Sequence, residues 1–207
     1  MRTGSQGARA ASTGVDTGLL PGELERPEPS IERPGRASEI VAAARTILGA
    51  EGSDALTMRH VAEALGIKAP SLYKHFPNKK AIEAALVTDA MIEIGEATHA
   101  ALRQPGASRP LTRLLATYRA HCRANAAAYR LATQASFARD QLPAGLEAWA
   151  GNPFYVVTGD PSLAQALWSF AHGMVVLELD GRFPPGSDLD ATWRAGADAF
   201  ERAAATG

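Results

Sequence analysis

The chain has 207 residues, of which 46% are hydrophobic, so it can bury one good core or a small domain joined to a larger one. Its formal net charge of −1 neither favours nor excludes a nucleic-acid partner. The single cysteine, Cys122, excludes an internal disulfide framework and a metal site built from several cysteines. It is typical of a small buried apolar residue.

Residues 1–36 are predicted to form a disordered tail. Sixteen of these 36 residues are Gly, Pro, Ser or Thr, and their charges cancel, so the segment cannot bury enough apolar surface to offset its ordering entropy. A leader without a role is favoured, and the alternative is an arm that reaches a neighbouring DNA groove through Arg33 and Arg36. No charged segment followed by an apolar one opens the chain, so we expect no secretory signal and a cytoplasmic protein.

The segment that follows predicts an amphipathic helix. Ser38 is placed to cap its N-terminus, and Gly52 is placed to end it. The apolar residues that follow helical spacing between them are Ile40, Val41, Ala44, Ile47 and Leu48. We expect this helix to support the next two.

Residues 56–80 predict two short helices joined by a tight turn. Thr57 can cap the first helix, and Gly66 lies at the turn, where only glycine adopts a left-handed conformation without a side-chain clash. The second helix is expected over Ala69–Phe76, stopped by Pro77, with Asn78 capping a fourth helix. This layout is typical of a helix-turn-helix, whose second helix lies in the DNA major groove.

A helix-turn-helix that serves packing alone is the alternative to a DNA-binding one. Packing would not require Tyr73, His75 and Lys79 in polar positions beside the apolar ones. Residues 37–80 also carry a net charge of +2, against 0 for residues 1–36 and −3 for residues 81–207. This modest positive excess supports phosphate contacts.

Residues 56–79 resemble the DNA-binding head of the tetracycline-repressor (TetR) family. Eleven of the 24 positions match the family pattern without a gap, namely Leu56, Thr57, Arg59, Ala62, Gly66, Leu72, Tyr73, His75, Phe76, Asn78 and Lys79. The resemblance implies that a symmetric dimer binds a nearly palindromic DNA operator.

The resemblance also implies two sets of DNA-contacting residues. Those placed on phosphate are Tyr73, His75 and Lys79, with Thr57 and Arg59 reaching phosphate or a base edge. Those facing the groove, where bases are read, are Ala69, Pro70, Ser71 and Lys74. Position 74 departs from the bulky aromatic of some members, so the operator sequence does not transfer.

Residues 81–207 predict a larger helical domain. Helices are expected over Lys79–Ala101, Leu111–Cys122, Ala126–Ser136, Leu146–Ala150, Pro161–Asp180 and Asp188–Ala205, with irregular chain after Ala150. We therefore predict an all-α fold of about nine helices in three parts: a tail (1–36), a three-helix head (37–80) and a ligand-binding and dimerisation domain (81–207).

Two features describe the C-terminal half further. Its longest charge-free run, Pro161–Leu177, has seventeen residues and is short for a bilayer, so no membrane partner is expected. Residues 167–183 resemble the ligand-binding and dimerisation domain of one TetR subgroup through Trp168, His172-Gly173 and Leu177-Glu178-Leu179. This implies a homodimer through the last two long helices, where Ala195, Gly196 and Ala199 would let a partner helix approach closely.

The function implied is a transcriptional repressor released from its operator by a small-molecule effector, with no cofactor and no metal. The residues proposed to line the effector site are Tyr118, His121, Cys122, Tyr129, Phe137, Trp149, Phe154, Tyr155, Trp168, Phe170 and His172. Their aromatic character favours an apolar, aromatic or lipid-like effector.

Two other classes of protein compete with this interpretation. An enzyme would need a constellation that the sequence does not offer, because His121 and Cys122 are adjacent on a helix and point about 100° apart. There is also no zinc-protease motif and no glycine-rich phosphate loop. A helical scaffold protein with a non-functional helix-turn-helix would show no specific DNA affinity.

Overall fold

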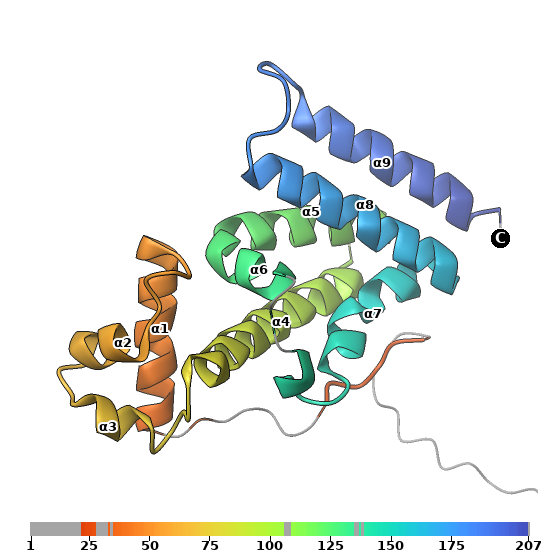
Figure 1. Ribbon diagram of the computed structural model, residues 1–207. Helices are drawn as coiled ribbons and strands as arrows, with labels where there is room; N and C mark the ends of the chain where they lie inside the picture. The colour runs from red at the N-terminus through yellow and green to blue at the C-terminus, as the bar shows by residue number, and fades with distance from the viewer. Residues whose placement is uncertain are drawn as a thin grey trace, which may run out of the picture.

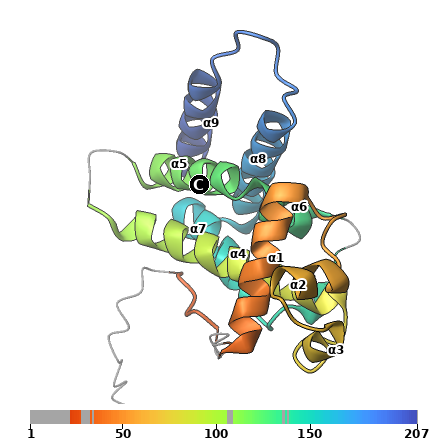
Figure 2. The ribbon, with the colours of Figure 1, turned by 90° about the vertical axis from the view of Figure 1, so that its left-hand side faces the viewer.

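The computed structural model describes residues 22–27, 33, 35–105, 109–134, 137 and 139–206. Over these residues the fold is built from nine α-helices and one 3-10 turn, η1 (Arg139–Gln141), and contains no β-strand. The all-α prediction is therefore confirmed. Figures 1 and 2 show a small group of helices at one end, a long helix that leaves it, and a helical body.

The small group comprises α1 (Arg36–Glu51), α2 (Met58–Ala64) and α3 (Ala69–Leu72). The hydroxyl of Thr57 accepts a hydrogen bond from the backbone N–H of His60 and caps α2, as expected. Gly66, at φ +64°, makes the turn between α2 and α3. Asn78 caps the next helix by accepting a hydrogen bond from the N–H of Ala81.

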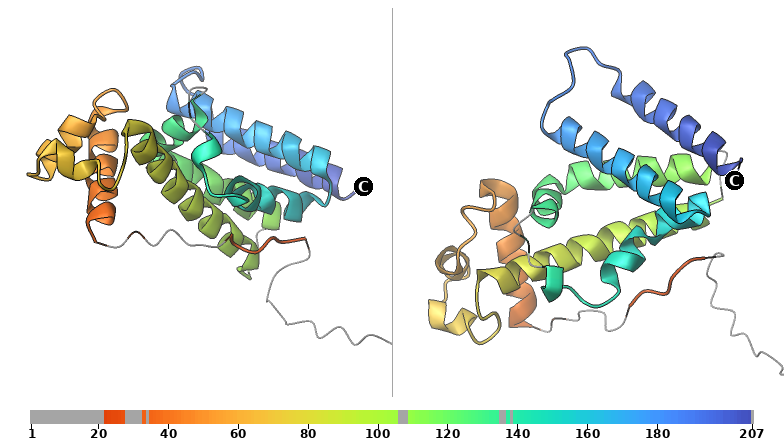
Figure 3. Two further views of the ribbon diagram at one scale, coloured as in Figure 1. Left: turned by 60° about the horizontal axis from the view of Figure 1, so that its bottom comes forward. Right: turned by 45° about the vertical axis from the view of Figure 1, so that its right-hand side comes forward.

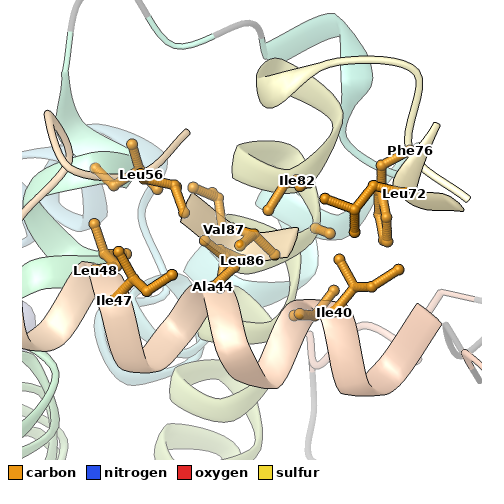
Figure 4. Packing of buried hydrophobic residues seen from close by; sticks show 14 of the residues in the cluster. Ile40, Ala44, Ile47, Leu48, Leu56, Leu72, Phe76, Ile82, Leu86 and Val87 are labelled. Carbon is orange, nitrogen blue, oxygen red and sulfur yellow. The ribbon is translucent and has the colours of Figure 1, made fainter. Parts of the chain in front are cut away.

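The core of the head extends beyond residue 80, into the first turns of α4 (Lys79–Arg103). Figure 4 shows Ile82, Leu86 and Val87 of α4 packed against Ile40 of α1 and Leu72 of α3. All five side chains are at most 1% exposed. The head and the N-terminal half of α4 therefore form one packed unit.

The body consists of α4 with five further helices. These are α5 (Pro110–Ala124), α6 (Ala126–Thr133), α7 (Leu146–Thr158), α8 (Pro161–Leu179) and α9 (Leu189–Ala204). A second core joins α5, α8 and α9 around Leu114, Leu167, Val175 and Trp193. In Figure 1, α8 and α9 lie at the side of the body away from the head.

Three helix boundaries differ from the sequence prediction. Ser38 does not cap α1, which begins at Arg36 after Gly35; its hydroxyl donates to the carbonyl of Arg33 instead. Helix α3 ends at Leu72, after which a turn is closed by hydrogen bonds from His75 and Phe76 to the carbonyl of Leu72.

The third difference is α7, which runs to Thr158, well past the predicted end at Ala150. Pro153 lies inside it and cannot donate to the carbonyl of Trp149, four residues earlier. Nε2 of His99 lies 3.0 Å from that carbonyl and supplies the missing hydrogen bond. A partner from α4 thus lets α7 continue through a proline.

Within the segment predicted to be a disordered tail, residues 22–27 and Arg33 contact the body. Glu23 is buried and pairs with His99 and Arg103 of α4. The side chain of Asn152, on α7, accepts from the N–H of Leu24 at 2.9 Å and donates to the carbonyl of Gly22 at 3.0 Å. Figure 3 shows this N-terminal segment beside α4 and α7. The rest of the predicted tail, residues 1–21, 28–32 and 34, lies outside the described residues.

Arg33 anchors the same segment nearer the head. Its guanidinium donates to both carboxylate oxygens of Asp89 at 2.7 and 2.8 Å and to the carbonyl of Ala85 at 3.2 Å. Arg36, the second residue considered for a DNA-binding arm, pairs with Glu39. Among the described helices, none combines the length and the apolar character needed to cross a bilayer.

Candidate DNA-binding interface and ligand cavity

The predicted DNA-contacting residues around α3 lie on its outward face. Leu72 is fully buried and Phe76 nearly so, and these two side chains fix the helix against the head core. The exposed residues on the opposite side are Pro70, Ser71, Tyr73, Lys74 and His75, with Ala69 half-buried. Tyr73 is 53% exposed, which is unusual for a large aromatic residue and places its ring and hydroxyl within reach of a partner.

Thr57 and Arg59 are both exposed at the start of α2. The Thr57 side-chain oxygen is used as a cap, but its hydroxyl can still donate. Arg59 pairs with Glu63 one turn later at 2.7 Å, and its side chain is 87% exposed. Such an exposed pair is weakly held, so a phosphate can displace the carboxylate.

Lys79 is engaged within the protein. Its ammonium donates to the carbonyl of Ser53 at 2.9 Å and lies 3.4 Å from Glu83. An ammonium has three donors, so these contacts leave one for a phosphate. In this structure Lys79 ties the start of α4 to the chain between α1 and α2.

The body contains an open cavity of about 430 Å³ lined by residues of α4, α5, α6, α7 and α8. Seven of the eleven residues proposed from sequence line it: Tyr118, His121, Cys122, Tyr129, Phe154, Trp168 and His172. This volume lies within the range of small-molecule sites.

The other four proposed residues lie elsewhere because the helices turn them away. Phe137 packs against the core of the head. Trp149 stacks on His99 on the N-terminal-segment side of α7, with ring centroids 5.1 Å apart. Tyr155 is 38% exposed beside Gly22, and Phe170 packs between α8 and α9 against Trp193.

Sequence reasoning missed the lining residues that are not aromatic. These are Ala90, Met91, Ile94, Asn125, Ala132, Thr133, Arg139, Glu147, Ala150 and Gly151. The three from α4 follow helical spacing, and a search for apolar periodicity on α4 would have found them. Ala150 and Gly151 lie on the same helix as Phe154, α7, and their small size gives no sequence signal for a cavity.

A chain of hydrogen bonds crosses the cavity wall. The hydroxyls of Tyr118 and Tyr129 lie 3.1 Å apart, and the Tyr129 hydroxyl lies 2.6 Å from Nδ1 of His172. The His172 ring stacks on Trp168, with centroids 5.4 Å apart and planes 19° from parallel. One side chain each from α5, α6 and α8 thus takes part in a continuous chain of hydrogen bonds.

Burial favours the uncharged forms of the tyrosine, cysteine and histidine side chains of the cavity. It raises the pKa of both tyrosines and raises the pKa of the Cys122 thiol to about 12. It lowers the pKa of His121 and of His172 below the ordinary value. Within the described ranges, no three His, Cys, Asp or Glu side chains are placed to hold a metal ion.

Comparison with known proteins supports the interpretation of the head. Residues 40–86 match the family model described as bacterial regulatory proteins, tetR family. The chain is also 29% identical over 170 residues to an uncharacterised HTH-type transcriptional regulator, Rv0681, of Mycobacterium tuberculosis. That alignment covers 73% of this chain and 75% of the relative.

The head of this chain, residues 40–86, is that of the TetR family. This match and the fold support a DNA-binding transcriptional regulator with a helix-turn-helix, as the sequence predicted. The matched residues 40–86 include the first turns of α4, in agreement with a head core that extends into that helix.

Two solved structures share the fold of this chain. One is the putative regulatory protein SCO4313, with 22% identity, a TM-score of 0.65, and coverage of 79% of this chain and 94% of that one. The other is the multidrug binding protein EbrR complexed with imidazole, with 20% identity, a TM-score of 0.58, and coverage of 83% and 96%. At these identities the likeness concerns the fold.

Proposed function

We propose that this chain is a repressor that leaves a nearly palindromic operator when a small molecule occupies the cavity. The observation that carries the proposal is the double role of α4. Ile82 and Leu86 of this helix are part of the head core, whereas Met91 and Ile94 line the cavity. A change in the cavity can therefore be transmitted to the head along α4.

Release of the operator on ligand binding follows from a shift between two positions of the heads. A ligand moves the equilibrium between head positions only as far as its affinities for the two states differ. A molecule that fits the cavity better when α4 has tilted away from α7 would favour heads spaced wrongly for the operator. The multidrug binding protein EbrR, solved with imidazole, provides a precedent for a bound small molecule in this fold.

The DNA contacts are proposed by position. Tyr73, His75 and Lys79 hold phosphates, while Thr57 and Arg59 reach phosphate or a base edge. The bases are read from the face formed by Ala69, Pro70, Ser71 and Lys74. The proposal gives no residue a catalytic role: the Cys122 thiol lies in the cavity with a pKa of about 12 and is protonated at neutral pH.

We also propose a homodimer through α8 and α9. Leu177 is 41% exposed, and Gly173, one turn earlier on α8, has open space where a side chain would stand. On α9, Ala195 and Ala199 are exposed. A second copy would cover these small and apolar positions.

The role that the sequence predicted for Gly196, close approach of a partner's helix at the dimer interface, needs correction. A Cβ added there would lie 2.1 Å from Cζ of Phe170, on α8 of the same chain. This glycine is therefore needed for packing between α8 and α9 within one protomer. Ala195 and Ala199 remain as the small residues proposed to face the partner.

Sequencing the DNA fragments that the protein retains from a random pool tests DNA recognition and symmetry together. We expect an inverted repeat with half-sites one helical turn apart, roughly 34–36 Å. Fragments without a shared inverted repeat would contradict a symmetric repressor.

The substitution Ala199→Glu tests the dimer. It would place a charge from each copy at the proposed seam, and sedimentation should then show a monomer with weak operator binding. Ala50→Glu, the same change at an exposed position of α1, should leave the sedimentation of the dimer unchanged. A dimeric Ala199→Glu protein would place the interface elsewhere.

A further inference from the structure

The donor and the acceptor of the hydrogen bond between Tyr129 and His172 can be assigned from its length. The separation of 2.6 Å between the Tyr129 hydroxyl and Nδ1 of His172 is typical of an O–H donor and short for an N–H donor. Tyr129 therefore donates to Nδ1. Because burial keeps the ring neutral, its proton lies on Nε2.

Nε2 of His172 is thus a donor on the wall of the cavity. Within the described residues, this nitrogen has no hydrogen-bond partner, whereas Nδ1 is held by Tyr129. Stacking of the ring on Trp168 fixes its orientation. His172 therefore presents a fixed N–H group at the cavity, and a ligand acceptor would satisfy it.

The charges around the cavity are already neutralised. Among the described lining residues, Arg139 and Glu147 are the charged ones, and they pair with each other. Glu93, whose charge acts on His121, is paired with Arg45 at 2.6 Å. To gain a counter-charge, an ionic ligand would have to displace one partner of the Arg139–Glu147 pair and lose part of its own hydration, which disfavours it relative to an uncharged ligand.

We infer that the cavity takes an uncharged, mainly apolar molecule with one oxygen acceptor, such as a ketone or an ester, which receives the Nε2–H of His172. This inference rests on the proposed function and specifies the class of effector. The apolar part lies among Met91, Ile94 and Phe154. Carboxylates and amines are disfavoured, because the charged groups of the cavity, Arg139 and Glu147, already pair with each other.

Four compounds of similar size test the class. Methyl 2-naphthyl ketone, 2-naphthoate and 2-naphthylmethylammonium share one ring system and differ in charge, and naphthalene lacks the acceptor. Their dissociation constants are measured by tryptophan fluorescence on the unmodified full chain at pH 7.5. We expect the ketone to bind at least tenfold more tightly than either ion. Equal or tighter binding of an ion, or no binding of the ketone, would overturn the inference.

Two matched variants test the donor. The ketone should bind the unmodified chain several-fold more tightly than naphthalene does. His172→Phe should abolish this advantage, because the ring shape remains and the N–H is lost. His121→Phe removes the other histidine of the cavity and should retain the advantage. Loss of the advantage in His121→Phe alone would assign the donor to His121 and overturn the role of His172.

Release of DNA is measured separately, on fragments selected from the random pool. If the ketone binds and the DNA stays bound, the proposed control of DNA binding fails while the effector class stands. If naphthoate binds and releases the DNA, the effector class fails while ligand-controlled repression stands. The two proposals can therefore fail independently.

Discussion

Glu23 and His99 are 76 positions apart in the sequence, yet a carboxylate oxygen of Glu23 lies 2.6 Å from Nδ1 of the His99 ring. Both side chains are almost completely buried. The other ring nitrogen donates to the carbonyl of Trp149, which Pro153 leaves without its usual partner. One histidine thus connects the N-terminal segment, α4 and α7.

Removing the carboxylate of Glu23 should destabilise the fold. Glu23→Gln leaves Arg103 and His99 without their negative partner, and we expect the free energy of unfolding to fall by about 2–4 kcal/mol. Glu25→Gln is the matched control, since Glu25 is exposed two residues away. Urea unfolding of both variants measures the difference, and equal midpoints would show that the buried pair is not a determinant of stability.

Tyr73 and Lys74 should differ in how they affect DNA binding. Tyr73→Ala should weaken binding to all sequences alike, because phosphate contacts carry no sequence information. Lys74→Ala should reduce discrimination at one or two operator positions by about 1–3 kcal/mol. Binding to a panel of operator variants separates the two outcomes, with Arg202→Ala on the exposed face of α9 as the control. A uniform loss in Lys74→Ala would assign Lys74 to phosphate.

A methyl group at Gly95 should disturb the contact between α4 and α7. An added Cβ would lie 2.3 Å from Cζ3 of Trp149, so the helices would have to move apart, at a cost of about 1–3 kcal/mol. Gly49→Ala, in open space on α1, should instead stabilise by up to about 1 kcal/mol through helix propensity. Thermal unfolding that ranks the two variants in the opposite order would contradict this packing.

The fall in the free energy of unfolding at acidic pH should depend on Glu178. Burial would raise its pKa, but hydrogen bonds from Arg119 at 2.9 Å and from Trp193 at 3.3 Å outweigh burial and lower the pKa. A lowered pKa in the folded state gives stability that is present above the unfolded pKa, about 4.3, and is lost as the pH falls through the folded pKa.

The variant Glu178→Gln should therefore show a shallower loss of unfolding free energy below about pH 4.5 than the parent. Asp54→Asn, at an exposed position, should keep the slope of the parent. Denaturant unfolding at a series of pH values gives both slopes. An unchanged slope in Glu178→Gln would assign the acid sensitivity to other carboxylates.

The head was predictable because its signals are local. Thr57 and Asn78 cap the helices that they precede, and Gly66 makes the turn that its conformational freedom allows. Each of these residues acts on neighbours within a few positions, so the sequence pattern contains the whole cause.

The parts that sequence reasoning missed depend on distant partners. Pro153 indicated the end of a helix, and the residue that compensates for it, His99, lies 50 positions away from the carbonyl that it satisfies. Gly196 indicated close helix contact correctly, but the pattern could not tell a partner in the same chain, Phe170, from a partner in a second copy. Composition likewise argued against order in a segment whose Glu23 is held by α4.

The hydrogen bonds between Asn152 and the backbone of Gly22 and Leu24 close loops of 130 and 128 residues. Asn152 follows Leu24 by 128 positions, so these two hydrogen bonds cannot form during synthesis until α7 has been made. The contacts of Glu23 with His99 and Arg103 need only α4, whereas those of Asn152 also need α7 in place. Residues 22–24 therefore reach their full set of contacts late in folding, and in unfolding experiments we expect them to detach early.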